Sequence, residues 1–194
     1  MFIIEDGTGD CYKAKVDKEN RLRTLAVTES IQQAISTDKE QAYQVIGEAT
    51  LASGTVTALH IKNTSTTRNM FITYLRHQVV DAAGGTALPN ASNYFSLALG
   101  RTVSSGGSAV VPVNVFGGSS NIAEATVTTG APTLSGTALE IDRWYTKAEA
   151  DMNSFSKQGA LILPPSQTLE MSYVGDHTSG ILYSRISFIM DDVV

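Results

Sequence analysis

The sequence has little cysteine, little charge and no long apolar run, and each shortage excludes a class of protein. Cys11 is the only cysteine, so neither an intrachain disulfide framework nor a cysteine-rich zinc site can form. No apolar stretch approaches the ~18–20 residues that a membrane-spanning helix needs. The opening MFIIEDGTGD also lacks the basic and apolar regions of a secretory signal. We therefore expect a protein that is made in a cytoplasm and does not depend on oxidation.

Charged residues make up 17% of the 194 residues, against roughly 25% in an average soluble protein. The formal net charge of -5 argues against a surface that binds nucleic acid by neutralising phosphates. The chain is instead rich in serine and threonine (40 together) and has 16 glycines. This composition is typical of short strands joined by turns and unfavourable for a helical bundle. Hydrophobic residues, at 42%, suffice for a core.

The charges are unevenly distributed, because residues 1–50 hold 15 of the 33. This boundary in composition predicts an N-terminal assembly arm over residues 1–40 and a body over residues 41–194. Within the arm, alternation over Tyr12–Val16 and Arg21–Val27 predicts a hairpin. An isolated hairpin is marginally stable in water, so this one is expected to dock on the body or on another subunit. Residues 28–35 fit either one or two helical turns or an extended linker.

The body has the pattern of strands throughout. The clearest alternation is at Thr168–Val174, where Leu169, Met171 and Tyr173 share one face. Pro112 indicates an edge strand or a bulge. The predicted strands are Ala42–Ile46, Val56–Lys62, Met70–Val79, Tyr94–Leu99, Ala109–Phe116, Ala138–Tyr145, Ala160–Leu163, Thr168–Val174 and Ile181–Met190.

One helix is expected to interrupt these strands, near residues 147–154, because Thr146 to Glu149 fits a capping box. About eight strands with polar loops predict an all-β fold made of two packed antiparallel sheets. The long loops favour Greek-key crossings. A single jelly roll is the first choice for this β-sandwich, and an immunoglobulin-like sandwich is the second.

Two glycine-rich or acidic features near the N-terminus invite a functional interpretation. Gly7-Thr8-Gly9 lacks the further glycine and lysine of a phosphate-binding loop. Glu5, Asp6 and Asp10 lie near these glycines and could hold Ca²⁺, but their spacing does not match the helix–loop–helix calcium pattern. A solvated turn is the favoured interpretation of both features.

The only histidines are His60, His77 and His177. Three histidines can bind zinc, but nothing in this spacing requires it. His177 follows Asp176 and could be oriented for base catalysis, yet no serine lies in a G-x-S-x-G turn. Structural or surface roles are therefore favoured, and we expect no catalytic, cofactor-binding or metal-binding residue.

Arg143-Trp144-Tyr145 is an aromatic cluster that could form a sugar-stacking or partner-contacting platform. The favoured alternative is a strand end packed under the short helix, because tryptophan is usually mostly buried. A small basic patch on the hairpin is interleaved with acidic residues, which favours a solvated or inter-subunit face over a nucleic-acid site. Its members are Lys13, Lys15, Arg21 and Arg23, with Asp10, Asp17 and Glu19 between them.

The opening of the chain resembles the N-terminal signature of a group of tailed-bacteriophage virion proteins. The resemblance covers about the first 30 residues, and the remainder is similar only in architecture. It is carried by Ile3-Ile4-Glu5-Asp6-Gly7-Thr8-Gly9, Tyr12-Lys13-Ala14-Lys15-Val16-Asp17, Asn20-Arg21-Leu22 and Ala26-Val27-Thr28-Glu29-Ser30.

Such proteins look like head decoration (cement) proteins or other small exterior components, often trimeric with a β-sandwich body. The resemblance implies a homo-oligomer, a trimer, in the virion, made in the host bacterial cytoplasm. Its partners would be the major capsid protein or other virion proteins, with no nucleic acid or membrane and no enzymatic activity.

Two alternatives remain open. One is a tail, baseplate or head–tail connector component, or a receptor-binding module that uses Tyr94, Trp144 or Tyr145. The other is a carbohydrate-binding or hydrolytic β-sandwich.

Overall fold

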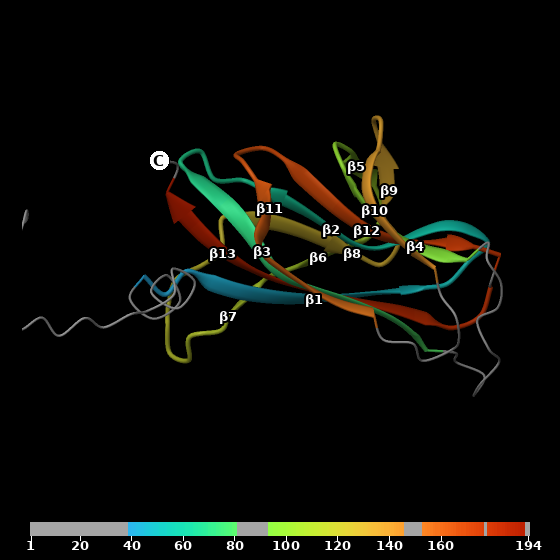
Figure 1. Cartoon of the computed structure of the whole chain (residues 1–194), viewed down its shortest axis with the longest axis horizontal. Helices are drawn as coiled ribbons and strands as arrows, with labels where there is room; N and C mark the ends of the chain where they lie inside the picture. The colour runs from blue at the N-terminus through green and yellow to red at the C-terminus, as the bar shows by residue number, and fades with distance from the viewer. Residues whose placement is uncertain (1–38, 81–92, 146–152, 177, 193–194) are drawn as a thin grey trace, which may run out of the picture. The chain divides into compact units, whose positions relative to one another are not determined.

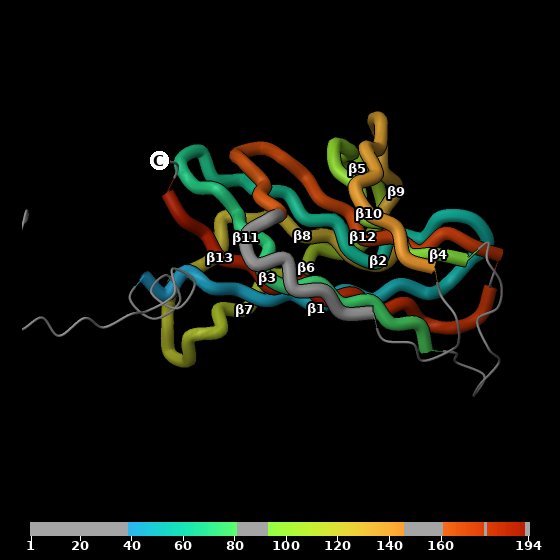
Figure 2. The backbone as a smooth tube through the Cα atoms, in the orientation of Figure 1, coloured from blue at the N-terminus to red at the C-terminus, as the bar shows by residue number. Residues whose placement is uncertain are grey.

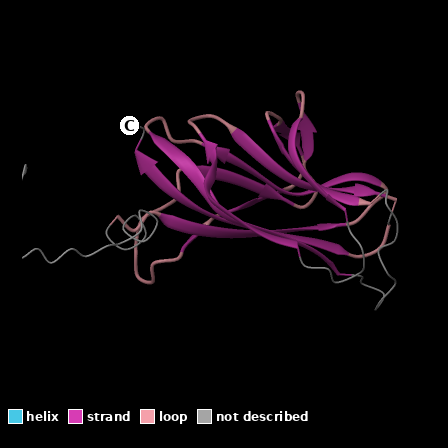
Figure 3. Ribbon diagram, in the orientation of Figure 1, coloured by secondary structure: helices cyan, strands magenta, loops and turns pink. Residues whose placement is uncertain are grey.

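A computed structural model describes residues 39–80, 93–145, 153–176 and 178–192 (Figure 1). In these residues every regular element is a strand, as Figure 3 shows. The strands are β1 (Ala42–Thr50), β2 (Gly54–Asn63), β3 (Arg68–Val80), β4 (Tyr94–Leu99), β5 (Thr102–Ser105), β6 (Ser108–Val110), β7 (Val113–Asn114), β8 (Ala125–Thr129), β9 (Thr133–Ser135), β10 (Leu139–Tyr145), β11 (Asn153–Leu163), β12 (Thr168–Gly175) and β13 (Ile181–Asp192).

These strands form two large antiparallel sheets and one small one. The five-stranded sheet has the order β11-β3-β13-β1-β7, and the six-stranded sheet has the order β10-β4-β12-β2-β8-β6. Strands β5 and β9 pair only with each other. The first and last long strands are neighbours, so in Figure 2 the blue β1 runs beside the red β13. The predicted all-β antiparallel sandwich is confirmed.

The core lies between the two large sheets and follows the period-2 pattern of the sequence. On β13 the predicted inward set is buried throughout, namely Leu182, Ile186, Phe188 and Met190. Facing residues on β4, Phe95 and Leu97, are also fully buried. Because side chains alternate between the faces of a strand, β4 and β13 contribute alternate residues to this core, and β3 does so with one change of phase between Ile72 and Leu75.

The predicted strands all fall on observed ones, with differences at three places. Pro112 divides the expected strand Ala109–Phe116 into β6 and β7, because proline cannot donate a ladder hydrogen bond. The short strands β5, β8 and β9 were not predicted. The helix predicted for 147–154 falls largely outside the described residues, and at its last two positions the prediction is wrong, because 153 and 154 already belong to β11.

At one edge the two large sheets meet through Thr129, the last residue of β8. Its Oγ1 accepts a hydrogen bond from the Glu48 N–H at 2.7 Å and lies 2.8 Å from the Ala58 carbonyl oxygen. This contact brings β1 so close to β2 that only glycine fits at position 47. A Cβ atom there would lie 2.7 Å from the Ala58 carbonyl oxygen and 2.8 Å from Thr129 Oγ1.

Candidate functional site

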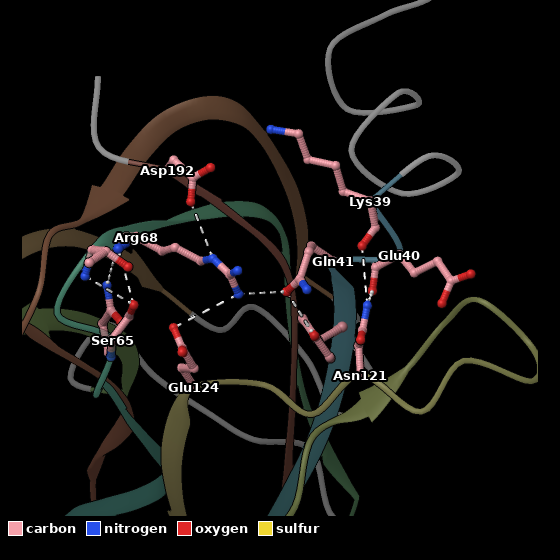
Figure 4. A network of polar contacts seen from close by, with 11 residues as sticks. Lys39, Glu40, Gln41, Ser65, Arg68, Asn121, Glu124 and Asp192 are labelled. Carbon is pink, nitrogen blue, oxygen red and sulfur yellow. Dashed lines mark hydrogen bonds and ion pairs between the residues drawn. The ribbon is translucent and has the colours of Figure 1, made fainter.

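The first described residues, Lys39 and Glu40, are tied to the body by polar contacts (Figure 4). The Lys39 ammonium lies 2.7 Å from the Asp191 carboxylate, and this partner raises the pKa of Lys39 above its usual value. Asn114 donates to the Glu40 carbonyl at 2.8 Å, and Asn121 donates to the Lys39 carbonyl at 3.2 Å. The path of the chain into β1 is therefore set by the end of β13 and by the segment around β7.

Arg68 extends this network across the start of β3. Its guanidinium lies 3.5 Å from Gln41 Oε1, 3.4 Å from the Asp192 carboxylate and 4.0 Å from that of Glu124 (Figure 4). These groups are largely exposed, so each ion pair contributes little stability by itself. Together with the contacts of Lys39 and Glu40, they hold the last two residues of the predicted arm and Gln41, the first residue of the predicted body, in one geometry.

The segment beside this junction exposes five large apolar side chains, which we call the 111–122 apolar rim. The rim is anchored to the first residue of β1, because the Val115 N–H donates to the Ala42 carbonyl at 3.0 Å. Single exposed apolar residues are common on protein surfaces, whereas several within one short segment are unusual and make the segment a candidate contact surface. Its members and their exposed fractions are Val111 (73%), Val113 (69%), Val115 (54%), Phe116 (39%) and Ile122 (76%).

A second feature is a groove of about 240 Å³ on the outer face of the six-stranded sheet. Its floor holds Glu170 of β12, whose side chain is only 4% exposed. Arg101, just before β5, donates to both Glu170 oxygens, from Nε at 3.0 and 2.8 Å and from Nη2 at 2.5 Å. The Arg101 carbonyl lies 3.0 Å from His60 Nε2. Ser172, on the same strand, is buried as well, and its hydroxyl lies 2.9 Å from Thr57 Oγ1.

The wall of the groove is formed by an ion pair on β10. Arg143 donates to Glu140 at 3.0 and 2.5 Å, which lowers the pKa of the Glu140 carboxyl and raises that of Arg143. The guanidinium lies 4.1 Å from the centre of the Tyr94 ring, a cation–π contact. Tyr145, 53% exposed, lies 5.8 Å from Tyr94 between ring centres. The groove thus presents aromatic and polar surface, with its charged groups already paired.

The two histidines that the structure describes lie in different sheets. His60 lies on β2 of the six-stranded sheet and His77 on β3 of the five-stranded sheet, while His177 is outside the described residues. Asp176 N–H donates to Asn93 Oδ1 at 3.2 Å. Across the described ranges, no group of three or more His, Cys, Asp or Glu side chains could hold a metal ion.

Trp144 is half-buried and packs against the core, 6.0 Å from the His77 ring. This placement agrees with the favoured prediction of a packed strand end, although the helix expected above it lies outside the described residues. Of the Arg143-Trp144-Tyr145 cluster, Arg143 and Tyr145 are the exposed members.

The remaining residues singled out in the sequence lie in the first 38 positions and are not described. These are the Gly7–Gly9 turn, the carboxylates Glu5, Asp6 and Asp10, Cys11, and the basic patch of Lys13, Lys15, Arg21 and Arg23. The Arg101–Glu170 pair was not predicted. The only feature of the sequence that pointed to this pair was Glu170, a carboxylate in the middle of the strand with the most regular alternation of apolar residues.

Comparison with known proteins adds no relative, since no family model, curated protein or solved structure matches the chain. In the part of the chain that the structure describes, no helix has the length and apolar character needed to cross a membrane.

Proposed function

We propose that the chain is a non-enzymatic structural component of a bacteriophage virion, a capsid decoration (cement) protein that binds and stabilises the capsid surface through its N-terminal arm. The observation that carries the proposal is the opening signature, from Ile3-Ile4-Glu5-Asp6-Gly7-Thr8-Gly9 to Ala26-Val27-Thr28-Glu29-Ser30. A compact antiparallel β-sandwich is the kind of body that such exterior proteins have. A trimer, and the major capsid protein as partner, are parts of the same proposal.

We further infer that the sandwich is a single jelly roll. Leaving out β5 to β9, the eight remaining strands pair first with last (β1–β13), second with seventh (β2–β12), third with sixth (β3–β11) and fourth with fifth (β4–β10). This is the pairing of one long hairpin rolled into two sheets by Greek-key crossings. Strands β5 to β9 then form an insertion between the fourth and fifth strands of the roll.

The junction at residues 39–41 supports a role for the arm. The contacts to Lys39 and Glu40 come from β13 and from the β7 segment, so the point where the predicted arm joins the body is fixed. The 111–122 apolar rim lies on the same segment and is available for contact. Strand addition by an arm would supply backbone hydrogen bonds as well as side-chain packing, and exchange of arms would link subunits.

The first experiment is mass spectrometry of purified particles with stoichiometry. A decoration protein is expected in hundreds of copies per particle. A handful of copies would instead indicate the tail, baseplate or connector, and no copies in the particle would overturn the virion assignment.

The second experiment deletes residues 1–35, which leaves the contacts of Lys39 to Gln41 in place. The truncated body is expected to fold, as judged by circular dichroism and thermal melting, but not to co-sediment with particles that lack the protein. The full-length chain, added to the same particles, is the control. Normal particle binding by the folded truncation would refute the role of the arm.

The receptor- or glycan-binding alternative is favoured by one observation, the exposed Tyr145 ring at the edge of the groove. A glycan screen with the wild-type chain tests it, with Tyr145→Ala and the half-buried Trp144→Ala as variants. Binding that is lost in Tyr145→Ala would support this alternative, whereas a screen with no hit counts against it.

A further inference from the structure

The outer face of the five-stranded sheet places two arginines directly opposite each other. Arg76 of β3 and Arg185 of β13 are cross-strand partners in the antiparallel register. Their sequence neighbours Leu75, His77 and Ile186 are fully buried, so the two guanidiniums point to the outer face. Both arginines are half-buried. Like charges directly opposite on neighbouring strands destabilise a sheet, so this arrangement needs an explanation.

These two arginines differ from the other arginines that the structure describes. Arg68, Arg101 and Arg143 each form an ion pair with a carboxylate. For Arg76 and Arg185, by contrast, the side-chain acceptors are amides: Gln78 Oε1 lies 3.0 Å from Arg76 Nη2, and Gln44 Oε1 accepts from Arg185 Nη2. Among the described residues, neither arginine has a carboxylate partner. In a chain with a net charge of -5, these two cations are left without a counter-charge on the described surface.

One donor of this pair is also buried without an acceptor. Arg185 Nε has no hydrogen-bond partner among the described groups, although the atom is shielded from solvent. A buried donor on a charged group costs more when unpaired than any other kind of donor. Because this atom is shielded from solvent, an incoming oxygen acceptor reaches it only when the Arg185 side chain shifts.

The shape of the surface limits what the acceptor can be. The arginines border a hollow of about 210 Å³ with Ile46, Gln78 and Tyr183. Ile46 is 56% exposed, and the Arg185 guanidinium lies 5.6 Å from the centre of the Tyr74 ring. A cationic floor with apolar and aromatic walls matches a carboxylate carried on a short apolar stem. Two guanidiniums can together donate several parallel N–H bonds to such a group.

We propose that Arg76 and Arg185 form a carboxylate-binding cradle that receives an acidic side chain of a partner protein. The carboxylate-binding role of the cradle is inferred from the contacts of the two arginines, whereas the location of the partner on the capsid surface rests on the proposed function. The free protein accepts a repulsive pair of charges, and binding of a carboxylate supplies the missing counter-charge. The cradle would thus stabilise the bound state more than the free one.

The first arm of the test uses the full chain and defined probes at constant ionic strength, because exposed charges are screened by salt. Isothermal titration calorimetry compares three probes. A hexaglutamate peptide stands for acidic side chains, glutarate for a free carboxylate, and inorganic phosphate for another oxyanion. Hexaglutamate is expected to bind. Arg76→Gln and Arg185→Gln should each weaken that binding by about tenfold or more, which is the effect of losing one charge-assisted hydrogen bond. Arg143→Gln, an arginine already paired with Glu140, is the matched control and should bind as the wild type does.

Thermal melting of the unliganded variants provides a second readout that does not depend on any ligand. Removing one of two opposed cations should raise the Tm of Arg76→Gln by about 1–3 °C. Arg143→Gln, which breaks an ion pair, should not show this rise. A fall in the Tm of Arg76→Gln would mean that the contacts of Arg76 within the chain outweigh its repulsion from Arg185, and it would overturn the premise of an uncompensated pair of charges. Equal hexaglutamate binding by the wild type and both cradle variants would overturn it as well, as would tighter binding of phosphate than of hexaglutamate.

The second arm measures co-sedimentation of the same variants with particles. Loss of particle binding in Arg76→Gln and Arg185→Gln, but not in Arg143→Gln, supports a partner on the particle. Hexaglutamate binding by a chain that is absent from particles would refute the virion function and support the cradle. Normal particle binding by both cradle variants would refute the capsid as the source of the carboxylate.

Discussion

Lowering the pH from 7.5 to 5 should destabilise the folded body through His77. This side chain lies on β3 with no solvent exposure, and its ring stacks on Phe95 at 4.8 Å with an interplanar angle of 9°. Its Nδ1 lies 2.9 Å from Ser184 Oγ, while Nε2 is buried with no hydrogen-bond partner among the described groups. A charged ring would have to remain in this apolar setting. Burial therefore lowers the pKa of His77 from 6.5 to about 3.

The direction of the effect follows from the pH at which the folded and the unfolded state each bind a proton at His77. Below pH 6.5 the unfolded chain takes up a proton at His77, whereas the folded chain does not until the pH approaches 3. The unfolded state is therefore favoured progressively as the pH falls. The free energy of unfolding loses about 2 kcal/mol between pH 7.5 and pH 5, and about 5 kcal/mol once the pH is below 3. For a body of this size, 2 kcal/mol corresponds to about 4–8 °C in Tm.

Urea denaturation at several pH values between 5 and 7.5 measures this loss, with wild type and His77→Gln compared at each pH. The substitution has its own cost, but that cost does not depend on pH and cancels in the comparison of slopes. Other titrating groups contribute equally to both proteins. The wild type should thus lose about 2 kcal/mol more than His77→Gln over this range. If the free energies of unfolding of the two proteins changed in parallel with pH, His77 would be protonated as easily in the folded as in the unfolded state. Burial would then not lower its pKa.

Two further substitutions test the packing of the body by chemical denaturation. Arg101→Leu leaves the Glu170 carboxylate buried without its partner and should lower the free energy of unfolding by about 3–5 kcal/mol. The double variant Arg101→Leu/Glu170→Leu should recover most of that loss. An unchanged free energy of unfolding in the single variant would mean that the carboxylate is hydrated. Gly47→Ala puts a methyl group 2.7 Å from the Ala58 carbonyl oxygen and should cost about 1–3 kcal/mol. Gly117→Ala, where a Cβ atom meets nothing within 4 Å, is its control and should be neutral.

The strands that could be predicted are those whose apolar residues repeat with period two. On β12, Leu169, Met171 and Tyr173 face the core as the alternation indicates. The missed strands have too few apolar residues for such a signal. Strand β8, for example, reads ATVTT and buries one large apolar side chain, Val127. It is a strand because it pairs with the edge of β2, and that edge is not visible in the local sequence.

The candidate sites were harder to predict, because they depend on pairs of residues that are distant in the chain. Alternation correctly places Glu170 on the face opposite Leu169, but it does not show that Arg101, 69 residues away, covers that face. The cradle could not be predicted for the same reason. Arg76 and Arg185 become neighbours only through the register between β3 and β13, and a one-residue slip would remove their opposition.

The two outer faces of the sandwich differ in whether their arginines are paired with carboxylates of the same chain. This difference affects which face is suited to bind an acidic partner. On the six-stranded sheet, Arg101 and Arg143 are neutralised within the chain by Glu170 and Glu140. That face gains little from an external charge, because a new carboxylate would have to compete with one already in place. On the five-stranded sheet, the opposed Arg76 and Arg185 gain a counter-charge when a carboxylate arrives. If the arm tethers the body to a surface, the five-stranded face is therefore the one that specific charge pairing would turn toward it.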